Sequence, residues 1–218
     1  MHEIESLNVL GYRNQALANT YFRAKLETTH LAVLLPGLGY TSQMPVMYYP
    51  CMALLASGAD VIRADYNYVK QPDFMTLDPD ERRRLAALDG SSIVQAALRQ
   101  RKYQKVTLVG KSIGTFAIGH IITSVEKLPH LQCLWLTPLL KNEQLLSQIK
   151  QVKHKALVVI GTSDPYYDKS NLDDILKVTG GQSIVIDGAD HSMEIAGDPI
   201  KSLQAMERIM SATVKFLE

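Results

Sequence analysis

The sequence has few cysteines, few aromatic residues and no long apolar run. Only two cysteines, Cys51 and Cys133, occur among 218 residues, too few for a disulfide framework or a cysteine-rich zinc site. Each stands in an apolar stretch, so we expect a buried thiol that packs as a small hydrophobic group. The longest nearly apolar stretch, 46–56, contains Pro50 and is far shorter than the roughly 20 residues of a membrane-spanning helix.

An excess of charge of one sign is also missing. Lys and Arg total 23 and Asp and Glu total 22, which gives a formal net charge of +1. This balance argues against a nucleic-acid partner, and we expect the one basic triplet, at 82–84, to be a solvated helix face. Residues 1–5 are polar and acidic, unlike a secretory signal. We therefore expect a cytoplasmic protein with no membrane partner, and the sequence predicts no particular oligomeric state.

The overall composition predicts a chain that folds around a real core. Apolar residues make up 46% and charged residues 21%, both ordinary values for a globular protein. Because domains average about 150 residues, we expect residues 1–218 to form one domain. The chain has no internal repeat, low-complexity segment or flexible linker.

Short apolar runs alternate with helical patterns along the chain. Residues 4–10 and 17–24 flank a turn at 11–14 and predict a leading β-hairpin. Six later runs, most of them closed by turn residues, predict strands buried on both faces: 31–35, 61–62, 105–109, 131–136, 156–160 and 183–186.

Helices are expected between these strands. Helical patterns occupy 44–57, a long region beginning at Asp78 in which Gly90 is a candidate break, and then 113–127, 141–152 and 200–217. Such alternation predicts an α/β protein whose mostly parallel sheet carries helices on both faces. In these sheets ligands bind at the carboxyl ends of the strands.

The clearest functional signal is the motif Gly-Lys-Ser-Ile-Gly at 110–114, which directly follows a predicted strand. Small residues two before and two after Ser112 permit a sharp strand-to-helix turn that exposes its hydroxyl. The Gly-Lys-Ser part also matches the end of a phosphate-binding P-loop. That loop needs a glycine at position 105, where this chain has Lys105. A dinucleotide-binding glycine motif is missing as well, so we expect no cofactor.

A serine nucleophile needs a base and an acid that orients the base. Of the six histidines, only His191 lies just beyond the end of a predicted strand, so it is the expected base. Asp164 follows another strand and is the expected acid, with Asp168 as its closest rival. The predicted catalytic residues are therefore Ser112, Asp164 and His191, in that chain order, without a metal.

An oxyanion hole needs two backbone N–H donors. The sharp turn at Ser112 supplies the first donor, the backbone N–H of Ile113. For the second donor we expect the N–H of Leu38, with Gly39 as the alternative, because the loop at 36–40 follows the first parallel strand and contains two glycines. Candidate residues of the substrate cleft are Gly37, Gly39, Tyr40 and Tyr166.

These motifs and their order resemble the α/β-hydrolase superfamily. The resemblance covers nearly the whole chain: the hairpin, about six further strands and the long final helix. It implies that Ser112 is the nucleophile, His191 the base and Asp164 the orienting acid. Family members often have a histidine where this chain has Pro36, and Lys111 beside the nucleophile is unusual.

The segment between 136 and 156 is too short for the lid that many members insert there, so the chain resembles small lidless esterases and dienelactone-hydrolase-like members. The resemblance implies a serine hydrolase of the carboxylesterase or thioesterase type, which cleaves a small-molecule acyl substrate through an acyl-enzyme. Two alternatives stay open. One is an acyltransferase or C–C hydrolase with the same triad, and the other is a non-catalytic binding module.

Overall fold

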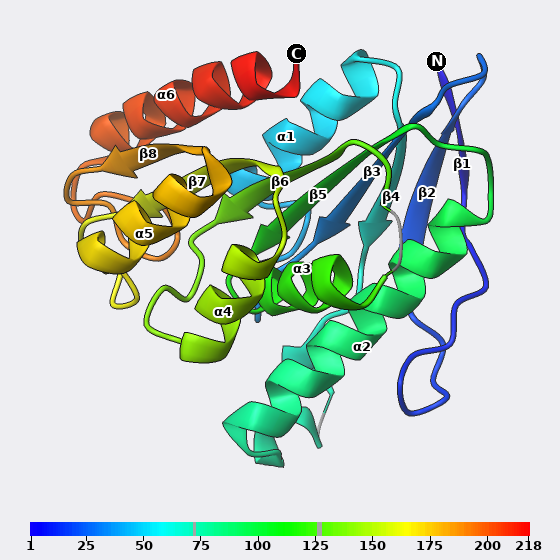
Figure 1. Cartoon of the computed structure of the whole chain (residues 1–218), viewed down its shortest axis with the longest axis horizontal. Helices are drawn as coiled ribbons and strands as arrows, with labels where there is room; N and C mark the ends of the chain where they lie inside the picture. The colour runs from blue at the N-terminus through cyan, green and yellow to red at the C-terminus, as the bar shows by residue number, and fades with distance from the viewer. Residues whose placement is uncertain (72, 126–127) are drawn as a thin grey trace.

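The computed structural model describes residues 1–71, 73–125 and 128–218. These residues form a sheet with helices packed on both faces (Figure 1). The strands are β1 (His2–Glu5), β2 (Asn19–Ala24), β3 (His30–Leu35), β4 (Asp60–Ala64), β5 (Lys105–Lys111), β6 (Leu131–Leu136), β7 (Lys155–Gly161) and β8 (Gln182–Ile186). The α-helices are α1 (Pro45–Ala56), α2 (Pro79–Leu98), α3 (Ile113–Ser124), α4 (Glu143–Gln151), α5 (Lys169–Thr179) and α6 (Pro199–Leu217). Two short 3-10 helices, Tyr68–Lys70 and Phe74–Thr76, precede α2.

The strand order is β1-β2-β4-β3-β5-β6-β7-β8. β1 pairs with β2, and β2 with β4, in antiparallel fashion, while all the other pairs are parallel. Each of the six predicted runs lies inside one of these strands, so the predicted α/β fold class is confirmed. Parallel pairing brings the carboxyl ends of β3 to β8 to one edge of the sheet, where the predicted site residues follow the strands.

Two apolar layers hold the sheet between its helices. α1 and α6 cover one face, and α2, α3 and α4 cover the other (Figure 1). Because both faces of β3, β5, β6 and β7 are covered, their side chains are almost entirely buried on both sides. The two cysteines, Cys51 and Cys133, are buried and free, as predicted. No helix within the described ranges is long and apolar enough to cross a membrane.

The leading hairpin differs from its prediction in length. β1 and β2 pair from His2 opposite Ala24 to Glu5 opposite Tyr21, so the strands are shorter than the predicted 4–10 and 17–24. Beyond them, Val9 and Leu17 are buried in the core. The chain leaves the ladder at this point because these apolar side chains pack inward, and only one isolated bridge continues the pairing.

Gly90 does not interrupt its helix, contrary to the prediction, and α2 continues from 79 to 98. A Cβ atom on Gly90 would lie 2.6 Å from the Cβ of Ala117 in α3. The glycine therefore lets two helices approach closely, and this close packing outweighs its modest cost of about 1 kcal/mol inside a helix.

Other boundaries differ by a few residues. α3 ends at Ser124, and predicted helical residues 126–127 lie outside the described part of the chain. α4 spans 143–151 where 141–152 was predicted. Helix α5 was not predicted; it begins at the cap residue Asp168, buries Leu172 and Ile175, and ends at Gly180.

A buried carboxylate, Asp60, joins the first strands at the amino end of β4. Its side chain is inaccessible to solvent. Oδ2 accepts hydrogen bonds from the hydroxyls of Tyr21 (2.9 Å) and Tyr103 (2.7 Å), and Oδ1 accepts one from the backbone N–H of Ala24 (2.7 Å). The guanidinium of Arg101 lies 3.5 Å away and balances the charge. Every oxygen of this carboxylate is therefore held by the surrounding fold.

Candidate active site

Ser112 occupies a strained turn between β5 and α3. Its φ of 52° and ψ of −119° are rarely adopted by residues other than glycine. A Cβ atom on Gly114 would lie 2.1 Å from the carbonyl oxygen of Leu35, and one on Gly110 would lie 2.8 Å from that of Gly114. Both positions therefore require glycine. The sharp strand-to-helix turn that the motif predicts is present, and backbone strain of this kind is typical of functional sites.

The three predicted catalytic side chains form one hydrogen-bonded chain. His191 Nε2 lies 2.8 Å from Ser112 Oγ, and His191 Nδ1 lies 2.7 Å from Asp164 Oδ2. The Asp164 side chain is fully buried, whereas that of His191 is 31% exposed. The other oxygen of Asp164 accepts the backbone N–H of Tyr166 (2.8 Å), which fixes the carboxylate in place. Residues far apart in the chain thus meet at the carboxyl edge of the sheet.

Asp168, the rival of Asp164, and two further carboxylates near His191 in the sequence have other partners. Asp168 caps α5 by accepting the backbone N–H of Asn171. Asp187 accepts the hydroxyl of Thr162. Asp190 accepts backbone N–H groups within its own loop. Asp164 is therefore the carboxylate that contacts the histidine.

The loop after β3 passes directly beside the serine. A Cβ atom on Gly37 would lie 3.4 Å from both Ser112 Cβ and the carbonyl oxygen of Lys111. Gly39 has a φ of 71°, in the left-handed region that glycine adopts without strain. No described group accepts a hydrogen bond from the backbone N–H of Leu38 or of Ile113. Both proposed donors are thus free to bind a ligand.

Lys111, whose role the sequence left open, points into the protein. It is 1% exposed. Its Nζ donates hydrogen bonds to Thr137 Oγ1 (2.9 Å) and to the carbonyl oxygen of His191 (2.7 Å), and it lies 4.4 Å from the centre of the Tyr40 ring. Burial lowers the pKa of Lys111 to about 8, although the nearby carboxylate of Asp164 acts in the opposite direction.

Two predicted cleft tyrosines lie in different surroundings. The ring of Tyr166 is partly exposed, and its centre lies 5.4 Å from that of the His191 ring. Tyr40 is buried, and its hydroxyl accepts the backbone N–H of Val46 at the start of α1. Burial raises the pKa of Tyr40.

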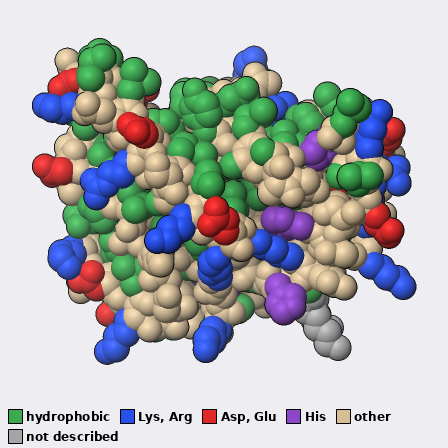
Figure 2. Space-filling view, turned by 90° about the horizontal axis from the view of Figure 1, so that it is seen from above, with side chains coloured by type: hydrophobic (Ala, Val, Ile, Leu, Met, Phe, Trp, Pro, Cys, Tyr) green, Lys and Arg blue, Asp and Glu red, His purple; other side chains and the backbone are tan. Residues whose placement is uncertain are grey.

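A groove of about 910 Å³ opens beside the candidate base, between the start of α1, the loop at 189–198 and α6. Asp190 and Ser192, the neighbours of His191, form part of its wall, whereas His191 and Ser112 themselves do not line it. Its apolar lining includes Tyr40, Pro45, Tyr49, Met193, Ile195, Leu203, Met206 and Met210. Four carboxylates also line it, from Asp190, Glu194, Asp198 and Glu207, and its lining contains no Lys or Arg. Figure 2, which views the side carrying α1 and α6, shows hydrophobic side chains gathered on this face.

Sequence reasoning gave no role to two features of this region. Thr137 has a φ of 44° and holds the buried ammonium of Lys111. Its position just after a strand was a usable signal. The groove depends on how α6 packs beside α1, and no local pattern indicates that packing. Among the described residues, no group of three or more His, Cys, Asp or Glu side chains could hold a metal ion.

The chain belongs to the α/β-hydrolase family, since a model of the α/β hydrolase domain matches residues 28–218. This match confirms the family resemblance noted in the sequence. No curated protein matches the chain.

Solved structures share the fold at low sequence identity. An esterase from Pyrococcus furiosus is 14% identical, with a TM-score of 0.72 over 99% of this chain and 92% of its own. Dienelactone hydrolase from Anabaena variabilis is 16% identical, with a TM-score of 0.73 over 99% and 97%. A Xanthomonas campestris serine hydrolase described as lacking a lid is 15% identical, with a TM-score of 0.69 over 99% and 94%.

Proposed function

We propose that this protein hydrolyses a small carboxylic ester or thioester through an acyl-enzyme on Ser112. The observation that carries the proposal is the continuous hydrogen-bonded chain from Ser112 through His191 to the buried Asp164. An isolated serine hydroxyl is a weak nucleophile, and a histidine within hydrogen-bond reach activates it. The esterase and dienelactone hydrolase that share this fold support the same class of reaction.

In the first half-reaction, His191 Nε2 takes the proton of Ser112 Oγ as the oxygen attacks the carbonyl carbon. Asp164 holds the imidazole in the tautomer with Nδ1 protonated and stabilises the imidazolium that forms. The oxyanion of the tetrahedral intermediate accepts the N–H groups of Ile113 and Leu38. His191 then gives its proton to the leaving alcohol or thiol, and the acyl group stays on Ser112.

In the second half-reaction, a water molecule replaces the alcohol or thiol. His191 takes a proton from this water, which attacks the acyl carbon, and the same two N–H groups stabilise the oxyanion. Collapse of the intermediate breaks the bond to Ser112 Oγ, which regains a proton from His191. The carboxylic acid leaves, and the enzyme returns to its starting state.

The groove beside His191 supports a preference within this class. Its size falls in the range of ligand sites, about 300–1,000 Å³. Apolar side chains favour an apolar group on the substrate, and the carboxylates disfavour an anionic one. We expect neutral or cationic esters with an apolar group to be hydrolysed faster than esters of the same length that end in a carboxylate. Leu203 lines this groove. The substitution Leu203→Ser should raise KM for a neutral ester with a long apolar group and leave KM for an acetate ester unchanged.

The proposal is tested by treating the protein with a fluorophosphonate and measuring its intact mass. We expect one adduct on the wild type and none on Ser112→Ala, because only an activated serine displaces fluoride from this reagent. Ser163→Ala, a serine near Asp164 but outside the proposed chain, is the matched control and should label as the wild type does. A wild type that carries no adduct and hydrolyses no ester would overturn the proposal.

A further inference from the structure

Lys111 is a charged residue in a place where charge is costly. It directly precedes the candidate nucleophile and is among the largest fully buried side chains of the protein. Moving an ammonium group out of water is strongly unfavourable unless its hydrogen bonds are replaced. An uncharged side chain of similar length would fill the same volume without this cost. The position of the charge therefore needs an explanation other than packing.

The contacts of the ammonium group join separate parts of the site. Its three N–H donors face two oxygens and one aromatic ring: Thr137 Oγ1 after β6, the His191 carbonyl after β8, and Tyr40 after β3. Lys111 itself is the last residue of β5 and precedes Ser112. One buried group thus connects the strand ends that carry the nucleophile, the base and the loop of Leu38.

We propose that Lys111 is a positioning residue for the hydrolysis proposed above. Its hydrogen bonds to the His191 carbonyl and to Thr137 hold the base in register with Ser112. This inference rests on the proposed function for its kinetic consequence. Its effect on the position of the imidazole is measurable without any substrate.

The first test is the proton NMR signal of the His191 Nδ1–H group, assigned by its disappearance in His191→Gln. In the wild type the hydrogen bond to Asp164 protects this proton from exchange with water. We expect the proton to exchange about tenfold faster in Lys111→Met, because the imidazole is no longer held against Asp164. Lys169→Met, which removes an exposed lysine paired with Asp173, should leave the signal unchanged. An unchanged signal in Lys111→Met would overturn the proposal.

The second test uses kcat and KM for an acetate ester between pH 5 and 9. In Lys111→Met we expect kcat to fall by about 10- to 100-fold, because small displacements of catalytic groups have effects of this size, while KM changes less than twofold. A purely structural lysine would lower the amount of folded enzyme and leave the kcat of the folded fraction unchanged.

Thr137 keeps the inference testable if Lys111→Met fails to fold. Thr137→Val removes one acceptor of the ammonium at nearly constant volume, and Thr137→Ser retains it. We expect kcat to fall in Thr137→Val and to recover in Thr137→Ser, and equal kcat values would count against the positioning role. If the wild type takes no fluorophosphonate and hydrolyses no ester, the proposed function fails. The NMR signal of the His191 Nδ1–H group still decides whether Lys111 holds the imidazole in place.

Discussion

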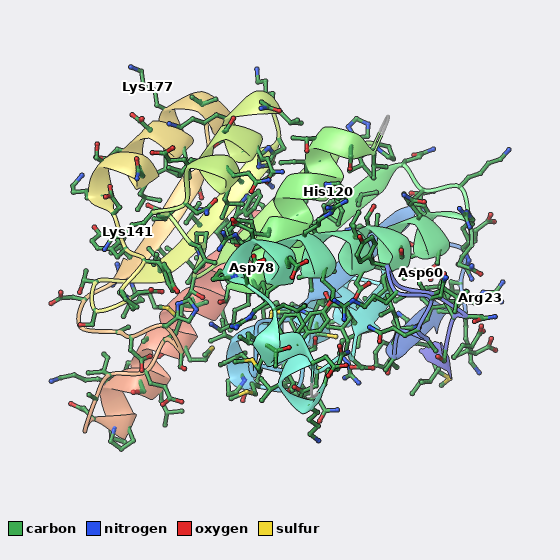
Figure 3. The ribbon with its side chains drawn as sticks, turned by 90° about the horizontal axis from the view of Figure 1, so that it is seen from below. Arg23, Asp60, Asp78, His120, Lys141 and Lys177 are labelled. Atoms are coloured by element: carbon green, nitrogen blue, oxygen red, sulfur yellow. The ribbon has the colours of Figure 1, made fainter. Side chains whose placement is uncertain are left out.

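Two buried carboxylates stand at opposite edges of the sheet, and their surroundings differ in kind. Asp60 begins β4 and lies beside the first strands, far from Lys141 near the start of α4 (Figure 3). Asp164 follows β7 at the carboxyl edge. Both side chains are fully inaccessible to solvent. Asp60 receives donors that remain inside the fold, whereas the partner of Asp164 is His191, which is partly exposed and reaches Ser112.

The two carboxylates show that one sheet can place residues that stabilise the fold at one edge and residues that can transfer protons at the other. At Asp60, two tyrosine hydroxyls and a backbone N–H donate hydrogen bonds to the carboxylate, so both of its oxygens are already bound by groups of the fold. At Asp164, the hydrogen-bonded chain continues outward and ends on a hydroxyl group at a strained turn. A closed network of this kind holds strands together, and an open one can transfer a proton.

Of the substitutions that distinguish the two carboxylates, Asp164→Asn should have the largest effect on activity. The amide would favour the wrong imidazole tautomer, and kcat should fall by about 10³- to 10⁴-fold. The midpoint of urea unfolding should change little. Asp168→Asn is the matched control, since Asp168 only caps α5, and it should keep most of the activity. A similar loss of activity in both variants would contradict the assignment of Asp164.

Asp60→Asn should give the reverse result. One oxygen acceptor is lost, donors from Tyr21, Tyr103 or Ala24 are left unpaired, and the charge of Arg101 is uncompensated. We expect the free energy of unfolding to fall by about 3 kcal/mol, measured by urea denaturation. The kcat of the folded protein should stay within twofold of the wild type. A large fall in kcat without a loss of stability would remove the distinction between the two edges.

The pH dependence of stability should have opposite signs at the two edges. At the carboxyl edge, the pKa of Lys111 is about 8 in the folded protein and near 10.5 when unfolded. Between these values the unfolded chain binds more protons, so stability rises with pH. From pH 7 to 9.5 we expect this residue to contribute about 2 kcal/mol. Urea denaturation of the wild type and Lys111→Met should show the rise in the wild type alone.

At the other edge, burial raises the pKa of Tyr21 to about 12, above its ordinary value of 10.0. The folded protein keeps this proton longer than the unfolded chain does, so stability falls as pH rises above 10. From pH 9 to 11 we expect a loss of about 1 kcal/mol from Tyr21. Tyr21→Phe should make the decline shallower in denaturant titrations. An equally steep decline in this variant would show that other groups cause it.

Much of the fold could be predicted because its signals are local. The runs 105–109 and 156–160 are apolar and stop at a glycine, a pattern typical of parallel strands that are buried on both faces, and they lie inside β5 and β7. The positions of Ser112, Asp164 and His191 followed from the same runs, because each residue comes just after a strand.

The remaining features depend on contacts between distant segments. Gly90 was a candidate helix break, yet its neighbour Ala117 in α3 makes it a packing position. The orientation of Lys111 could not be predicted, because its partners Thr137 and His191 come from two other strand ends. Helix α5 did carry local signals, namely the Asp168 cap and the apolar spacing of Leu172 and Ile175.

The chain order of the site has a consequence for protein synthesis. Ser112 and His191 are 79 residues apart, and ribosomes add roughly 5–20 residues per second. The strained serine is therefore made about 4–16 seconds before the histidine that would activate it. Under the proposed function, the nascent chain holds the serine without its base during that interval. Reactivity toward acyl compounds would then begin only when the last strand, β8, has joined the sheet and brought His191 to Ser112.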